Sequence, residues 1–78
     1  MAQRVDEAAS PAAVEWDLKR LQARFVAARR GRDINVLSLE IGIHSSSLRH
    51  VEAGELPQIE AILRVCSWLG TTAYEFVR

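Results

Sequence analysis

The fold is decided by the stretch from residue 33 to residue 54, which reads DINVLSLEIGIHSSSLRHVEAG. Its first part places three apolar side chains at steps of three and four residues, the spacing of one helix face: Ile34, Leu37 and Ile41. Asp33 is of a residue type that caps the start of a helix, and Gly42 is of a type that ends one. We therefore predict a short helix between them, which needs tertiary packing to be stable.

The second part of this stretch predicts a tight turn and another short helix. Gly42 suits a positive φ angle, and Ile43 supplies an apolar plug for the turn. Ser45 or Ser46 is a suitable N-cap for the helix that follows. Two apolar side chains face the interior before Gly54 ends this helix: Leu48 and Val51. The outer face then carries four residues at helical spacing: Ser46, Arg49, His50 and Ala53.

Two short helices joined by a three- to four-residue turn containing glycine are typical of a helix-turn-helix, which lays its second helix in the DNA major groove. Arg49 is the strongest candidate for reading a base, because its planar fork matches the two acceptors of guanine. His50 can donate to a base or a phosphate. Ser45 and Ser46 lie at the helix N-terminus, where unpaired N–H groups and the helix dipole attract acceptors.

We predict that these four residues read DNA bases. A second set is expected to hold the DNA backbone: Arg30, Arg32, Asn35 and the turn residue His44. The function expected from this unit is sequence-specific binding of double-stranded DNA by a transcriptional regulator, with no cofactor.

The remaining segments predict more helices and no strand. Apolar positions at steps of three and four predict a helix from Val14 to Gly31, with Ser10 and Pro11 as a plausible start: Val14, Leu18, Leu21, Phe25 and Ala28. A fourth helix, closed by Gly70, has a predicted packed stripe of Ile59, Ile62, Leu63, Cys66 and Leu69. Thr71 or Thr72 is predicted to cap a last short helix, and Glu75 is placed to complete a capping box opened by Thr72.

These elements predict an all-α, compact bundle of four to five helices over residues 14–78. Residues 1–13 mix small and charged side chains with Pro11 and are expected to form a flexible N-terminal arm. Because this arm contains Arg4, it offers a way for a monomer to reach a neighbouring groove of DNA.

Charge is balanced over the whole chain, with 10 basic and 10 acidic side chains among 78 residues. This balance argues against a protein that coats nucleic acid indiscriminately. Basic residues nevertheless gather between residues 16 and 32, and the segment from 52 to 78 is acidic on balance, so we expect a molecule with two oppositely charged faces. The single cysteine excludes an internal disulfide, and we expect Cys66 to be a core thiol.

The sequence has no apolar signal segment and no apolar run long enough to cross a bilayer. We expect no membrane association, and a cytoplasmic protein associated with the nucleoid.

Residues 39 to 77 resemble the phage repressor and Cro family of helix-turn-helix proteins, also called XRE-type. The resemblance covers about half the chain and rests on IG at 41 and 42, Ile43, Ser47 before Leu48, VEAG at 51 to 54, Pro57, and the closing LGTTAYEF. It implies a lambda-repressor-like five-helix bundle and a repressor function of phage or bacterial type. It also implies base reading by Ser45, Ser46, Arg49 and His50, with His44 at the turn.

The resemblance further implies that Glu52 pairs with an arginine of the first helix, for which we choose Arg24. Three features depart from the family pattern, and one is that the apolar stripe of the first helix is shifted by about one residue relative to the usual spacing from the motif. Ile34 stands where the family commonly has a glutamine that touches a phosphate, and Glu55 lies in a loop that is usually basic. Glu55 is expected to repel a phosphate and to weaken DNA binding.

DNA binding has alternatives among other classes of function. A protein-interaction module, such as an antitoxin or anti-repressor, is the main alternative, because the net charge is zero and Glu55 follows the second helix. The histidines and Cys66 have poor spacing for zinc, and Ser45, His50 and Glu52 do not form a triad, so neither a metal site nor an enzyme is expected. On DNA we expect a homodimer, with monomeric binding as the alternative. Its predicted interface is Trp68, Tyr74, Phe76 and Val77.

Overall fold

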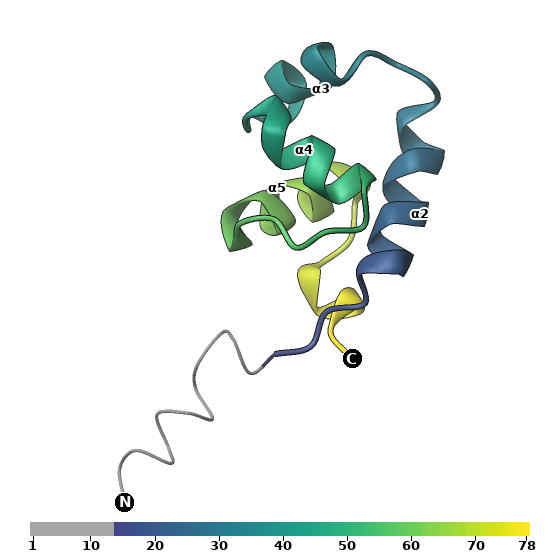
Figure 1. Cartoon of the computed structure of the whole chain (residues 1–78), viewed down its shortest axis with the longest axis vertical. Helices are drawn as coiled ribbons and strands as arrows, with labels where there is room; N and C mark the ends of the chain where they lie inside the picture. Colours follow the sequence, from purple (N-terminus) through teal and green to yellow (C-terminus); the bar gives the residue numbers. More distant parts are fainter. Residues whose placement is uncertain (1–13) are drawn as a thin grey trace, which may run out of the picture.

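The computed structural model describes residues 14–78, which fold into an all-α unit (Figure 1). Its helices are α2 (Leu18–Arg29), α3 (Ile34–Ile41), α4 (Ser45–Glu52), α5 (Ile59–Leu69) and the short 3-10 helix η2 (Ala73–Phe76). Within this range there is no strand, and the one β-type contact is an isolated antiparallel bridge between Trp16 and Val77. The predicted fold class is therefore confirmed at the level of an all-α bundle. The arm predicted for residues 1–13, with Arg4, lies outside the described residues.

The first described helix begins later than the sequence pattern predicted. Asp17 is the N-cap of α2, and its carboxylate accepts a hydrogen bond from the Arg20 backbone N–H at 3.2 Å. Val14 precedes the helix and is exposed, so its place in the apolar stripe was wrong. Val14 and Leu18 are four residues apart, a spacing that is compatible with a helix but does not require one. The cap at Asp17 decides where the helix starts.

The C-terminus packs against the start of α2, as Figure 1 shows. The Asp17 N–H donates to the Phe76 carbonyl at 2.7 Å, and the Arg78 N–H donates to the Glu15 carbonyl at 2.9 Å. The predicted capping box of Thr72 and Glu75 does not form, because Thr72 makes no side-chain cap hydrogen bond and the Glu75 carboxylate pairs with Arg24. The last element is a 3-10 turn, which places Phe76 in the core.

The core draws buried apolar side chains from every helix: Leu21, Phe25, Ile34, Leu37, Ile41, Leu48, Val51, Ile62, Val65, Cys66 and Phe76. Cys66 is buried as expected, and burial raises the pKa of its thiol; nearby Arg24 lowers this pKa and Glu75 raises it further.

The buried face of α5 differs from the predicted stripe. Ile59 and Leu63 are about half exposed, whereas Ala61 and Val65 are buried beside Ile62 and Cys66. The prediction of Ile59 and Leu63 as core residues was therefore wrong. The helix is apolar around more than half of its circumference, so periodicity allows two registers, and packing against α2 and α3 selects one.

Three of the six basic side chains in α2 and in the loop after it are paired with acids from later in the chain. Arg24 pairs with Glu75 at 3.5 Å, and Arg32 pairs with Glu40 at 3.2 Å. A third ion pair joins Arg29 to Glu52. The expected separation into two oppositely charged faces is therefore wrong in this region, because the fold brings the basic and acidic segments together.

None of the helices described for residues 14–78 has the length and apolar character needed to cross a membrane.

Candidate functional site

Local hydrogen bonds fix the turn between α3 and α4. The Asp33 carboxylate caps α3 by accepting from the Asn35 backbone N–H at 2.9 Å, as predicted. Gly42 has a φ of 88°, and the N–H groups of Gly42 and Ile43 both donate to the Ser38 carbonyl, at 2.8 and 3.1 Å. Because Gly42 takes a left-handed conformation, α3 ends there and α4 begins after only three intervening residues.

The cap of α4 is His44 rather than a serine. His44 is extended and makes no side-chain cap hydrogen bond, and Ser45 is the first helical residue. The predicted N-cap at Ser45 or Ser46 is therefore wrong by one or two positions. As a result, the hydroxyls of Ser45 and Ser46 both lie in the first turn of α4, beside the positive end of the helix dipole.

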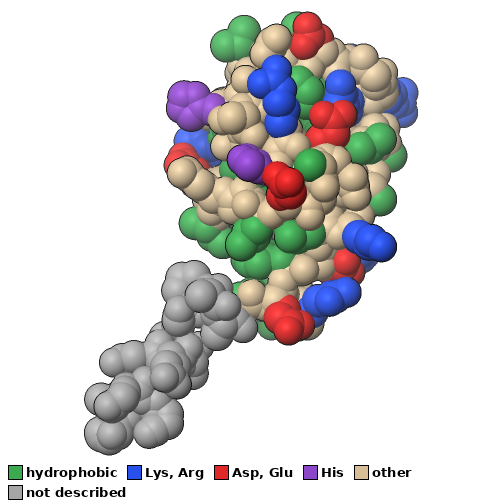
Figure 2. Space-filling view, viewed as in Figure 1, with side chains coloured by type: hydrophobic (Ala, Val, Ile, Leu, Met, Phe, Trp, Pro, Cys, Tyr) green, Lys and Arg blue, Asp and Glu red, His purple; other side chains and the backbone are tan. Residues whose placement is uncertain are grey.

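The two faces of α4 divide as the sequence predicted. Leu48 and Val51 are 0% and 2% exposed, and Ile43 packs against the core cluster from the turn. The other face is open: Ser46, Arg49, His50 and Ala53 are exposed, and Ser45 is half-buried. Figure 2 views the molecule from the side on which α4 lies in front, and both histidines of the chain are visible on that side. The chain therefore presents most of the predicted base-reading residues together on one surface.

Arg49 and His50 differ in how they are held. Among residues 14–78, the Arg49 guanidinium makes no ion pair and no side-chain hydrogen bond, so it is free to meet an acceptor. His50 is engaged: its Nδ1 lies 2.9 Å from a carboxylate oxygen of Glu55. Glu55 is thus in contact with the exposed face of α4, a role that its sequence position did not reveal.

The C-terminal end of α4 is tied to α2 by two contacts. The Gln22 side-chain amide donates to the Glu52 carbonyl at 2.6 Å, and the Arg29 guanidinium donates to the Glu52 carboxylate. The partner of Glu52 is therefore an α2 arginine, but it is Arg29 and not the predicted Arg24. Arg29 lies in the last turn of α2, which is the part that reaches the end of α4.

The residues expected to hold a DNA backbone separate into two groups. Asn35 is exposed in the first turn of α3, and His44 is exposed in the turn before α4. Arg30 and Arg32 instead line a groove with Leu69, at the end of α5. Arg32 also lies over the Trp68 ring, with 5.8 Å between guanidinium carbon and ring centroid, and pairs with Glu40. The structure therefore groups these two arginines with residues of α2 and with the end of α5.

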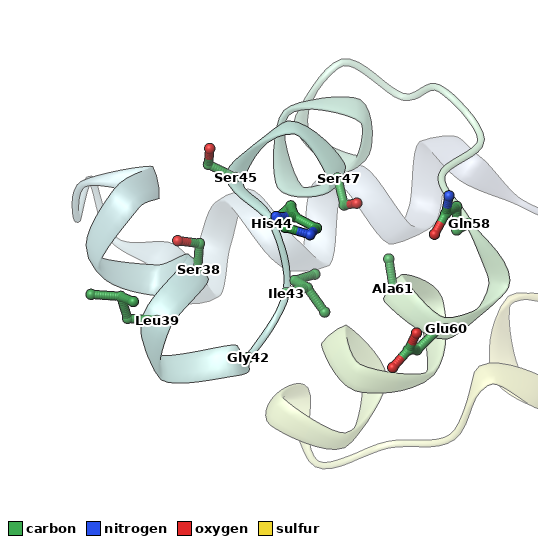
Figure 3. Close-up of a pocket in the computed structure, with 10 residues that line it drawn as sticks. All are labelled: Ser38, Leu39, Gly42, Ile43, His44, Ser45, Ser47, Gln58, Glu60 and Ala61. Carbon is green, nitrogen blue, oxygen red and sulfur yellow. The ribbon is translucent and has the colours of Figure 1, made fainter.

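A groove with a volume of about 540 Å³ lies between the end of α3, the turn and the start of α5 (Figure 3). His44, Ser47 and Gln58 line it together with the apolar side chains of Ile43 and Ala61. Sequence reasoning missed the polar α5 side of this groove, because residues 58 to 60 lie far along the chain from the turn. Ser45 also lines this groove, and Figure 3 shows its hydroxyl pointing away from the other lining side chains.

No family model, no curated protein and no solved structure matches this chain in the comparisons made. Among the described residues there is also no cluster of three or more histidine, cysteine, aspartate or glutamate side chains placed to hold a metal ion. Functional inference therefore rests on the geometry of the exposed surfaces.

Proposed function

We propose that this protein binds double-stranded DNA sequence-specifically, with α3 and α4 acting as a helix-turn-helix and α4 as the recognition helix. The observation that carries the proposal is the exposed Arg49, which pairs with no side chain of residues 14–78, on the face of α4 opposite the buried Leu48 and Val51. The DNA major groove is wide enough to admit one α-helix, and base edges there can be distinguished by hydrogen bonding.

The other residues of the surface fit roles around Arg49. Ser45 and Ser46 lie in the first turn of α4, where free backbone N–H groups and the helix dipole favour a phosphate or a base acceptor. Asn35 and His44 lie at the start of α3 and in the turn, and they are assigned to the DNA backbone. Arg30 and Arg32 are given no phosphate contact, because they lie with Leu69 and Arg32 is paired with Glu40.

The regulatory role proposed is that of a repressor of phage or bacterial type, with a lambda-repressor-like fold. A compact domain that occupies an operator blocks polymerase without any chemistry of its own. Assignment to the cytoplasm and the nucleoid belongs to the same proposal.

The proposal is tested by selecting sequences from a random duplex pool and comparing affinities for selected and random duplexes. Arg49→Ala is expected to reduce the affinity for the selected duplex by about 5- to 150-fold relative to random duplex, the effect of losing ~1 to 3 kcal/mol of base discrimination. Lys19→Ala is the charge-matched control, because Lys19 is exposed at the start of α2. It should leave the ratio of the two affinities unchanged.

Two results would contradict base reading by α4. One is an equal loss of affinity for both duplexes in Arg49→Ala, which would mean that Arg49 contributes charge alone. The other is a selection that recovers no preferred sequence, together with binding that does not weaken as salt is raised.

A second candidate function is a protein-interaction module, and one observation favours it. α3 exposes two large apolar side chains, Val36 and Leu39, and Leu39 lies at the edge of the groove beside the turn. Exposed apolar side chains that gather beside a groove are a feature of protein-binding surfaces. A stoichiometric protein partner, lost in Leu39→Ala and accompanied by no salt-sensitive DNA binding, would favour this candidate.

A further inference from the structure

Glu55 is held next to the exposed face of α4 by the motif that ends this helix. Gly54 has a φ of 75° and its N–H donates to the Val51 carbonyl at 3.1 Å. The Glu55 N–H donates to the His50 carbonyl at 2.8 Å, five residues back. This pair of bonds is the Schellman motif, which satisfies the last carbonyls of a helix. This backbone hydrogen bond holds Glu55 beside His50, so the Glu55 side chain can reach the imidazole.

The Glu55 side chain makes a second contact with the same residue. Its carboxylate oxygen lies 2.9 Å from Nδ1 of His50. An ionised carboxylate can only accept, so this geometry requires the proton of a neutral imidazole to be on Nδ1. The residues that line the hollow beside the ring are uncharged and offer no competing ion pair: Ser46, Ser47, Leu56, Pro57 and Gln58.

The consequence concerns the other ring nitrogen. When Nδ1 carries the proton of the neutral ring, Nε2 is a hydrogen-bond acceptor. In the major groove an acceptor pairs with an amino group, which adenine presents at N6 and cytosine at N4. This differs from the roles that the sequence alone predicts, in which His50 donates to a base or a phosphate and Glu55 repels a phosphate.

We propose that Glu55 is a positioning residue that fixes the neutral tautomer of His50, so that Nε2 of His50 accepts a hydrogen bond from adenine N6 or cytosine N4. The base-reading part of this inference rests on the proposed function. Both side chains are more than half exposed in the free protein, where water weakens such a pair.

The tautomer is tested first, in the free protein. Nitrogen-15 chemical shifts of the two His50 ring nitrogens are measured at a pH at which the spectrum shows a neutral ring, with His50→Ala used to separate its signals from those of His44. We expect the proton on Nδ1 in the wild-type protein and a loss of this preference in Glu55→Ala. Glu15→Ala removes the same charge from an exposed position at the other end of the molecule and should leave the His50 shifts unchanged.

Base reading is tested by repeating the duplex selection with each variant. The base pair whose preference disappears in His50→Ala locates the contact, and removing the adenine N6 or cytosine N4 amino group of this base pair should weaken binding by the wild-type protein but not by His50→Ala. Glu55→Ala should reduce the preference at this base pair by about fivefold, the value of one hydrogen bond, and leave the base pair read by Arg49 unchanged. Glu15→Ala should alter neither preference.

The outcomes separate the two proposals. A wild-type ring with its proton on Nε2 would overturn the positioning role of Glu55, whatever the protein binds. An unchanged base preference in Glu55→Ala, at a base pair that His50→Ala relaxes, would overturn it as well. Failure to bind any duplex would overturn the proposed function and the base reading with it, whereas the tautomer would still be decided by the ring-nitrogen shifts.

Discussion

Glu52 shows how single contacts hold α4 in place. Its carboxylate pairs with Arg29, whose side chain is 19% exposed against 42% for Glu52. Its carbonyl receives the Gln22 amide. Arg24 points instead to the C-terminus, where its guanidinium lies 5.9 Å from the centre of the Phe76 ring and pairs with Glu75. Two arginines of α2 therefore pair with different parts of the bundle: Arg29 with the end of α4 and Arg24 with η2.

A double-mutant cycle distinguishes these two arginines. Arg29→Ala is expected to lower the free energy of unfolding by about 1 to 2 kcal/mol, because it leaves a partly desolvated carboxylate without its partner. The coupling energy between Arg29→Ala and Glu52→Ala should be about 1 kcal/mol, whereas Arg24→Ala and Glu52→Ala should be additive. Chemical denaturation measures all of these variants. Equal coupling of Glu52 to both arginines would contradict the assigned pairing.

At the scale of an element, α4 depends on the geometry of its last turn. Gly54 adopts a left-handed conformation, and a Cβ placed there would lie 3.3 Å from the Gln22 side-chain oxygen. Gln22 cannot move away freely, because its amide nitrogen is bonded to Glu52. Gly70 ends α5 with a similar φ of 82°, but a Cβ there would meet open space.

This contrast predicts the effects of two alanine substitutions. Gly70→Ala should cost about 1 kcal/mol of stability from backbone strain alone. We expect Gly54→Ala to cost roughly 1 kcal/mol more, because the Cβ also crowds Gln22 and loosens its bond to α4. Thermal or chemical unfolding measures both variants. Equal costs for the two substitutions would mean that Gln22 adapts without losing its hydrogen bond.

Elements with strong local signals were predictable from the sequence. α3 and α4 lie where Asp33, Gly42 and Gly54 placed them, because capping side chains and left-handed glycines act within a few residues. The exposed face of α4 followed from the same periodicity, since Leu48 and Val51 had to face inward. The start of α2 and the cap of α4 were missed, because more than one residue near each boundary was suitable.

Contacts between distant segments were not predictable in the same way. The buried face of α5 depends on which of two apolar registers packs against the other helices, and Ala61 and Val65 are as apolar as the Ile59 and Leu63 that were chosen. The side-chain contact between Glu55 and His50 depends on the Schellman motif that ends α4. The sequence does not specify where this motif places the Glu55 side chain. Periodicity specifies a face of a helix, whereas tertiary packing specifies its partner.

At the scale of the whole molecule, the C-terminus belongs more to the core than to an interface. Phe76 is fully buried, so its assignment to a dimer interface was wrong. Trp68 is half-buried and donates from its ring nitrogen to Glu40 at 2.8 Å, and Val77 forms the bridge with Trp16. Tyr74 alone of the four predicted interface residues is largely exposed, at 84%. The homodimer stays a prediction with a smaller surface than first assigned.

Charge is also organised by the whole fold. Arg24, Arg29 and Arg32 are each paired with an acidic residue, so half of the six basic side chains between residues 16 and 32 are partly neutralised. If the protein binds DNA as proposed, these three arginines contribute less positive charge to the contact than their number suggests. We therefore expect a weak dependence of binding on salt compared with proteins that neutralise many phosphates.

The most direct test of the central claim is a titration of the nitrogen-15-labelled protein with a selected DNA duplex, followed by amide chemical shifts. The largest shifts are predicted along the exposed face and first turn of α4, at Ser45, Ser46, Arg49 and His50, with small changes at Tyr74 at the other end of the molecule. Saturable shifts confined to α5 and η2, with α4 unperturbed, would contradict recognition of DNA by α4.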